Sequence, residues 1–115
     1  MPDQQTHLGQ AAHNEAFLTT IDGDVNGDWA MTVLFYTALH YVDAYLAKQN
    51  NEHPGNHDER DRLIQSHPKT RVARPHYRRL FDRSHDARYR CVPFSAAAVG
   101  SLKATDFEPL KQALQ

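Results

Sequence analysis

The sequence predicts an all-α fold, and three features lead to that prediction. Apolar residues recur at intervals of three and four through most of the chain, no stretch alternates as a β-strand would, and helix-breaking residues separate the periodic segments. With 115 residues, the length indicates a single domain, residues 1–115, that can bury its own core. We therefore expect a bundle of four main helices followed by a short C-terminal helix.

The first two helices are expected over residues 5–21 and 28–49. The glycine-rich and Asx-rich segment DGDVNG ends the first helix, and Asp28 is a good N-cap for the second. Apolar residues surround most of the second helix, which predicts that it is central and buried. Three of its residues should be out of solvent: Phe35, Leu39 and Val42.

A short third helix is expected over residues 57–66. Asn56 followed by Glu59 resembles a capping box with Asn in place of the usual Ser or Thr. The pair His67-Pro68 should end this helix, because the residue before a proline disfavours the α conformation.

The fourth helix is expected to begin near Pro75, since proline is favoured in a first turn, and to end before Pro93. Cys91 falls on its apolar stripe and is therefore interpreted as a core residue. Residues 94–104 are ambiguous. Thr105 with Glu108 is a second capping-box pattern, which predicts that a terminal helix opens there and runs to about residue 114.

Charge is distributed unevenly along the chain, although the formal net charge is only -1. Residues 1–50 hold six acids and one base, whereas residues 69–90 hold eight bases and two acids. A basic segment of this kind attracts phosphate-bearing partners or an acidic surface. The alternative is a solvated helix face that balances the acidic first half of the chain.

Several classes of protein and site are not expected. No apolar run is long enough to span a bilayer and the N-terminus lacks signal-peptide features, so we expect no membrane association and a cytoplasmic location. The single cysteine excludes an intramolecular disulfide and a multi-cysteine zinc site. No histidine pair lies four apart within one expected helix, and no glycine-rich phosphate loop occurs, so we expect neither a metal nor a cofactor.

His40 lies in the middle of the expected second helix. Tyr36, His40 and Asp43 are three or four residues apart and therefore line one helix face. Such a row could position a proton carrier, because histidine titrates near neutrality. The alternative, which we favour, is that His40 and Tyr36 are buried groups that are hydrogen-bonded to neighbouring helices.

Two further sets combine arginine with histidine. His57 and Arg60 lie three apart at a helix start, where a phosphate can be held, although a solvated polar surface is the alternative. In the fourth helix, Arg78 and His85 are seven positions apart and share nearly the same face, with Arg79 displaced by about a third of a turn. A phosphate-binding arginine and a proton-moving histidine are what phosphodiester cleavage through a ribose hydroxyl requires.

Four segments, in this order, resemble the small HEPN-type helical proteins of bacteria and archaea: HLGQAAHNEAFL, DWAMTVLFYTALHYVDAYL, HDERDRLI and YRRLFDRSHDARYRC. The resemblance covers roughly residues 7–92. Its most recognisable parts are the pattern W-(six residues)-Y-x-A-L-H and the closing S-x-x-A-R-Y. It implies an up-and-down bundle of four or five helices that often forms a two-fold dimer.

Members of the wider family are metal-independent ribonucleases with an arginine and a histidine four to six residues apart, and many act in toxin–antitoxin, antiviral and stress systems. The resemblance therefore implies an RNA-directed protein, or an endoribonuclease in which Arg78 or Arg79 and His85 or His40 are catalytic. Its expected partners are RNA or a nucleotide, an antitoxin or other protein, and a second copy of the chain. The alternative is a non-catalytic module that binds a nucleotide or a partner protein. In both cases the resemblance implies that six residues form one polar cluster: Tyr36, His40, His57, Arg60, Arg88 and Tyr89.

Overall fold

The computed structural model describes residues 1–49 and 51–115 with their side chains, and residue 50 as part of a helix. Within this described part every regular element is helical, which confirms the all-α prediction. The elements are α1 (Gln4–Leu18), α2 (Gly27–Asn50), α3 (His57–Ser66), α4 (Pro68–Tyr89), α5 (Ala96–Leu102), the π-helical turn η1 (Lys103–Phe107) and α6 (Glu108–Ala113).

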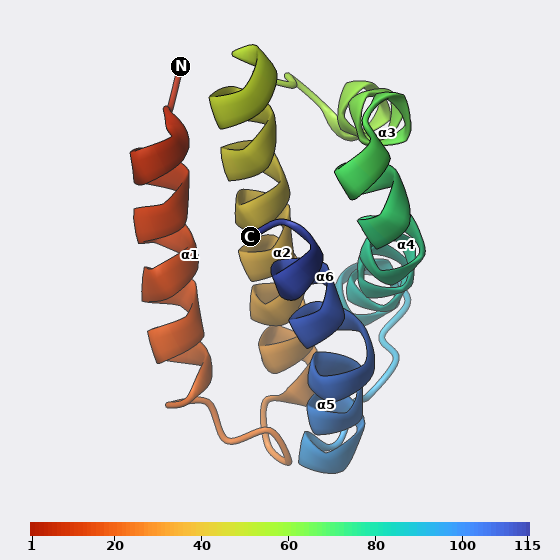
Figure 1. Cartoon of the computed structure of the whole chain (residues 1–115). Coiled ribbons are helices and arrows are strands. Elements are labelled where there is room, and N and C mark those ends of the chain that lie inside the picture. The colour runs from red at the N-terminus through yellow and green to blue at the C-terminus, as the bar shows by residue number, and fades with distance from the viewer.

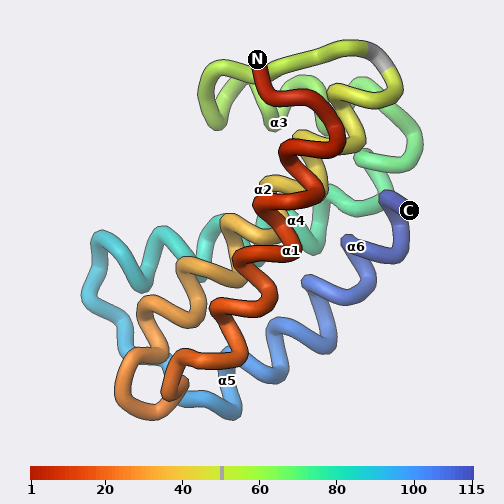
Figure 2. The backbone as a smooth tube through the Cα atoms, turned by 90° about the vertical axis from the view of Figure 1, so that its left-hand side faces the viewer, coloured from red at the N-terminus to blue at the C-terminus, as the bar shows by residue number. Residues whose placement is uncertain are grey.

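The helices form an elongated body with principal extents of 40 × 23 × 23 Å. The N-terminus and α3 lie at one end of this body, and residues 19–26 and 90–95 lie at the other end (Figure 1). Helix α2 is central, because it packs against α1 on one side and α4 on another. The C-terminal run from α5 to α6 contacts α2, and its η1 and α6 parts also pack against α4; Figure 2 shows the course of this run from α5 to the C-terminus.

The core lies mainly between α2 and α4. Phe35 and Val42 are fully buried and Leu39 is nearly so, as the sequence predicts. The Phe35 ring packs against two aromatic rings of α4, with centroids 5.6 Å from Tyr77 and 5.5 Å from Phe81. This aromatic packing fixes α4 against α2 and sets the position of the α4 side chains described below.

Helix α2 begins one residue earlier than predicted, and Asp28 is not its N-cap. The N-cap is Asn26, and the Asp28 carboxylate instead accepts a hydrogen bond from the Trp29 backbone N–H at 2.9 Å. The first helical residue is Gly27, where a Cβ atom would lie only 1.7 Å from the Phe94 carbonyl oxygen. The chain after α4 therefore crosses the start of α2 at a distance that only glycine permits.

The prediction that the fourth helix begins near Pro75 is wrong. His67 has an extended backbone, and α4 begins directly after it at Pro68, which occupies the favoured first position. The buried Thr70 hydroxyl donates to the Ile64 carbonyl at 2.7 Å and so joins the end of α3 to the start of α4. Pro75 lies inside α4, where proline has no backbone N–H to donate. The packing of α4 against α2 outweighs the cost of the lost intrahelical hydrogen bond.

Two further local predictions are corrected by the structure. The Thr105 hydroxyl donates to the Ser101 carbonyl at 2.9 Å inside a continuous helical run, so the terminal helix does not open there. The N-cap of this run is Ser95, whose side chain accepts from the Ala98 N–H at 3.1 Å. Cys91 is exposed, with a left-handed φ of 54° just beyond α4, and is not part of the core.

Candidate functional site

Cationic and aromatic side chains alternate along one face of α4. From residue 78 to residue 88 they recur three or four positions apart, and residue 89 lies four positions after residue 85, so these side chains lie above one another on the helix. One side chain from α2 and one from α3 reach the same face. We call this set the α4 face, and its members are Tyr36, His57, Arg78, Phe81, His85, Arg88 and Tyr89.

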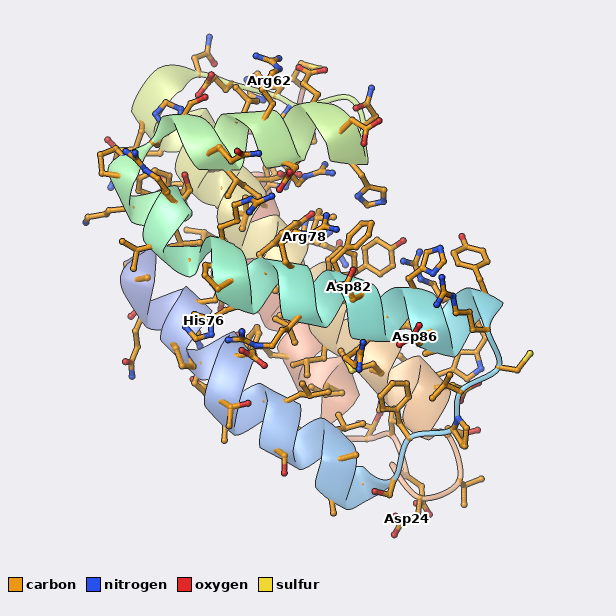
Figure 3. All side chains as sticks on the ribbon, turned by 90° about the vertical axis from the view of Figure 1, so that its right-hand side faces the viewer. Asp24, Arg62, His76, Arg78, Asp82 and Asp86 are labelled. Atoms are coloured by element: carbon orange, nitrogen blue, oxygen red, sulfur yellow. The ribbon has the colours of Figure 1, made fainter. Side chains whose placement is uncertain are left out.

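At the α3 end of the α4 face, a ring lies between an arginine and a histidine. The Arg78 guanidinium lies 4.7 Å from the centroid of the Phe81 ring. The His57 ring meets the same phenylalanine nearly edge-on, with centroids 5.2 Å apart. Arg78 is also 3.6 Å from the Asp82 carboxylate on the solvent side, a weak i,i+4 pair (Figure 3).

At the other end, Arg88 is held among three aromatic rings. Its Nη1 donates to the Tyr36 hydroxyl at 2.7 Å, and its guanidinium carbon lies 5.9 Å from the Phe35 ring, 5.3 Å from the Tyr36 ring and 5.1 Å from the Tyr89 ring. The His85 ring centroid is 5.0 Å from that of Tyr89. These contacts orient the guanidinium, while Tyr89 itself is 67% exposed. A preoriented arginine with an exposed ring beside it can meet a phosphate and a base together.

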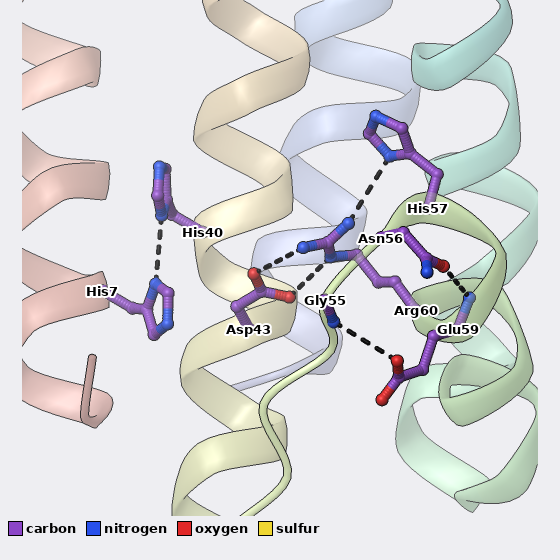
Figure 4. Close-up of polar contacts among 8 residues, drawn as sticks. All are labelled: His7, His40, Asp43, Gly55, Asn56, His57, Glu59 and Arg60. Atoms are coloured by element: carbon purple, nitrogen blue, oxygen red, sulfur yellow. Dashed lines mark hydrogen bonds and ion pairs between the residues drawn. The ribbon is translucent and has the colours of Figure 1, made fainter. Parts of the chain in front are cut away.

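Arg60, a predicted phosphate ligand, is engaged by a carboxylate inside the protein. Its Nε and Nη2 donate to the two Asp43 oxygens at 2.7 and 3.0 Å, and both residues are buried (Figure 4). Burial lowers the pKa of Arg60, but the hydrogen bonds and the charge of Asp43 outweigh it, so that the pKa is raised overall. Arg60 is therefore a structural cation rather than a free phosphate ligand.

The predicted contact between His57 and Arg60 is present. Arg60 Nη1 lies 3.4 Å from His57 Nδ1, and the Asn56 side chain caps the helix by accepting from the Glu59 N–H at 2.8 Å (Figure 4). Burial, together with the charges of Arg60 and Arg88, lowers the pKa of His57. An arginine can only donate, so Nδ1 accepts and the neutral imidazole carries its proton on Nε2.

His40 does not join the α4 face. It faces α1, where its Nδ1 lies 3.1 Å from Nδ1 of His7, whereas Asp43 on the same helix faces α3 (Figure 4). Burial lowers the pKa of both histidines, and the neighbouring imidazole lowers that of His40 further. The expected single cluster is thus divided between the two sides of α2. His40 bonds a neighbouring helix, as the alternative that we favoured requires, but it is only half-buried.

Arg79 also lies away from the α4 face. Its guanidinium binds Asp106 of η1 at 2.7 Å, and His76 binds the same carboxylate at 2.8 Å, on a different side of α4 from Arg78 (Figure 3). Asp106 is buried, which raises its pKa, but the two hydrogen bonds lower it by more. This second polar cluster was not predicted, because Asp106 comes from a tail whose packing the sequence pattern does not reveal.

Most arginines of the basic segment, residues 69–90, are paired with carboxylates. Such pairs reduce the field that the segment presents to solvent, although exposed ones contribute little to stability. The pairs are Arg74–Asp61, Arg78–Asp82, Arg79–Asp106, Arg83–Asp86 and Arg90–Asp86. The solvated, balanced helix face that we set beside the phosphate-binding alternative therefore accounts for part of this segment.

The described residues contain no group of three or more His, Cys, Asp or Glu side chains arranged to hold a metal ion. No described helix combines the length and the apolar character needed to cross a bilayer.

Comparisons of the chain with protein-family models, with curated proteins and with solved structures gave no significant match. The geometry itself thus defines the class: an all-helical protein whose fourth helix presents a face of alternating arginine, histidine and aromatic side chains.

Proposed function

We propose that this chain is an HEPN-like, RNA-directed protein that binds single-stranded RNA on the α4 face. The observation that carries the proposal is the alternation of oriented guanidinium groups and aromatic rings along that face. Proteins that bind single strands combine a cationic track for the phosphates with rings on which bases stack. Arg78, Phe81, Arg88 and Tyr89 supply both kinds of group within three turns of helix.

The contact between α2 and α4 supports the family part of the proposal. The pattern that ends at His40 lies on α2 and the pattern S-x-x-A-R-Y lies on α4. They meet where Arg88 donates to Tyr36, one residue from each pattern. The arrangement of α1, α2, α4 and the C-terminal run is compatible with the up-and-down four-helix bundle of that family (Figure 1). In this role the chain acts in the cytoplasm as a homodimer, with an antitoxin or another protein as its regulator.

In the catalytic form of the proposal, the α4 face cleaves RNA without a metal. His85 removes the proton from a ribose 2′-hydroxyl, the resulting oxygen attacks the adjacent phosphorus, and the bond to the 5′-oxygen breaks. The 5′-oxygen takes a proton from water as it leaves, so the products are a 2′,3′-cyclic phosphate and a 5′-hydroxyl. Arg78 or Arg88 stabilises the charge that develops on the phosphate, and the Nε2–H of His57 donates to it.

A second candidate function is a non-catalytic module that binds a nucleotide. The observation in its favour is the separation of Arg78 from His85, which are seven residues or about 10 Å apart along the helix axis. Each has its own neighbour, Asp82 for Arg78 and Tyr89 for His85. A phosphate held at Arg78 would then lie too far from His85 for proton transfer.

The experiment is cleavage of a labelled single-stranded RNA in the presence of EDTA. The wild-type chain should generate 2′,3′-cyclic phosphate ends, and His85→Ala should remain folded and inactive. His13→Ala, which removes an exposed histidine of α1, is the matched control and should cleave normally. RNA that is bound but not cleaved supports the non-catalytic module, and an absence of both binding and cleavage contradicts the proposed function.

A further inference from the structure

The one tryptophan of the chain is exposed beside a second exposed aromatic ring. Trp29, in the first turn of α2, is 62% exposed, and Tyr89, at the end of α4, is 67% exposed. Both line one pocket of about 300 Å³, which is near the lower end of the range for small-molecule sites. Large aromatic side chains left exposed in one place commonly mark a binding site.

The other residues that line this pocket are two small residues and two charged ones. Ala87 and Thr32 are nearly buried, and the Thr32 hydroxyl already donates to the Asp28 carbonyl at 2.8 Å. These two residues therefore offer a ligand little hydrogen bonding. The charged residues are Asp28 and Arg88.

Asp28 and Arg88 present opposite chemistry to a ligand. Asp28 lines the pocket, and one of its carboxylate oxygens accepts from the Trp29 backbone N–H at 2.9 Å, which leaves the carboxylate further acceptor sites. Arg88 is oriented by its hydrogen bond to Tyr36 and can only donate. A ligand that suits this pocket is therefore flat, has N–H donors on one edge and carries an anionic group.

We propose that the pocket binds a guanine nucleotide, with the base stacked on Trp29 and Tyr89 and the phosphate directed to Arg88. Guanine presents two adjacent N–H donors, N1–H and the N2 amino group, which a carboxylate can accept together. Adenine and cytosine place a ring acceptor beside their amino group, and uracil places carbonyls on both sides of its N–H, so each would meet Asp28 with a repulsive contact.

This inference rests on the proposed function and deepens it, because it gives the α4 face a base-selective subsite. Arg88 and Tyr89 belong both to the α4 face and to the pocket. A strand on the α4 face would reach the pocket at its Tyr89 end, so the pocket would select one base of the RNA.

The test uses the intrinsic fluorescence of Trp29, which is the single tryptophan of the chain. Titration of the full chain with GMP should quench this emission to saturation, and AMP, CMP and UMP should bind at least about tenfold more weakly. Tyr89→Ala should weaken GMP binding by about tenfold, the usual effect of removing one stacking ring. Asp28→Asn should abolish the preference for GMP over AMP while leaving the circular dichroism spectrum unchanged.

Phe17→Ala is the matched control, because Phe17 is 53% exposed and lines a different pocket, which includes Trp29 but neither Arg88 nor Tyr89. GMP binding should be unaffected by this variant. The inference is overturned if GMP leaves Trp29 emission unchanged, if AMP binds equally well, or if Phe17→Ala weakens binding and Tyr89→Ala does not. Quenching by GMP in a chain that neither binds nor cleaves RNA supports the pocket and contradicts the proposed function. RNA binding by a chain whose Trp29 emission GMP does not quench supports the proposed function and contradicts the pocket.

Discussion

Replacing Asp43 with alanine should destabilise the protein strongly, because it leaves Arg60 buried without its counter-charge. Both side chains are about nine-tenths buried, and two hydrogen bonds of 2.7 and 3.0 Å join them. Breaking a buried pair by removing one partner costs about 3–5 kcal/mol. For a chain of 115 residues, each kcal/mol lowers the melting temperature by about 4 °C, so Asp43→Ala should melt about 12–20 °C below wild type.

The assay is thermal unfolding followed by circular dichroism. Asp61→Ala is the matched control: it breaks a similar pair with Arg74 in which both side chains are partly exposed, and it should cost about 1 kcal/mol or less. The double variant Asp43→Leu with Arg60→Met should recover most of the lost stability, since apolar residues can replace a buried pair. Equal melting shifts for Asp43→Ala and Asp61→Ala would refute the reasoning, as would a double variant no more stable than Asp43→Ala.

Three other predictions follow from the histidine pair and from the family resemblance. His40→Ala should lower the free energy of unfolding, measured by urea denaturation, by about 1–3 kcal/mol, because His7 then loses its hydrogen-bond partner. A free energy of unfolding equal to that of wild type would contradict a structural role. The pKa values of His7 and His40 are lowered in the folded state, so the stability from this pair should be full above pH 6.5 and should decrease as the pH falls below 6.5. His7→Leu should reduce this decrease. A wild-type stability that does not change with pH in this range would contradict the prediction. Light scattering should give the mass of a homodimer, and a concentration-independent monomer mass would count against that assembly.

The helix content was predictable because it depends on local signals. The apolar character of α2 predicted its burial, and Asn56 with Glu59 predicted the start of α3. The errors occurred where a tertiary contact decides between local alternatives. Pro75 is a favourable first residue and also a tolerable interior one, and only the packing of α4 against α2 shows which applies. Likewise, only the closeness of Phe94 explains why the first residue of α2 is a glycine.

The candidate site was predictable in part. Helical spacing placed Arg78 and His85 on one side of α4, and both do belong to the α4 face. The same spacing could not show that Arg60 is committed to Asp43 or Arg79 to Asp106, because those carboxylates are 17 and 27 positions away. A row on one helix also cannot reveal that His40 faces α1 while Asp43 faces α3. Such assignments depend on which neighbouring helix each side chain meets.

The central claim is that RNA binds along the α4 face. The most direct test measures the affinity of a fluorescent single-stranded RNA for wild type, Arg78→Gln and Arg83→Gln at several salt concentrations. Both variants remove one positive charge from α4, but Arg78 lies over Phe81 on the α4 face, whereas Arg83 pairs with Asp86 on another side of the helix. Affinity should fall with salt because phosphate contacts release counterions, and Arg78→Gln alone should weaken binding and reduce the salt slope by about 0.7, the value for one contact to a single strand. Equal losses for the two variants, or binding that does not depend on salt, would contradict the account.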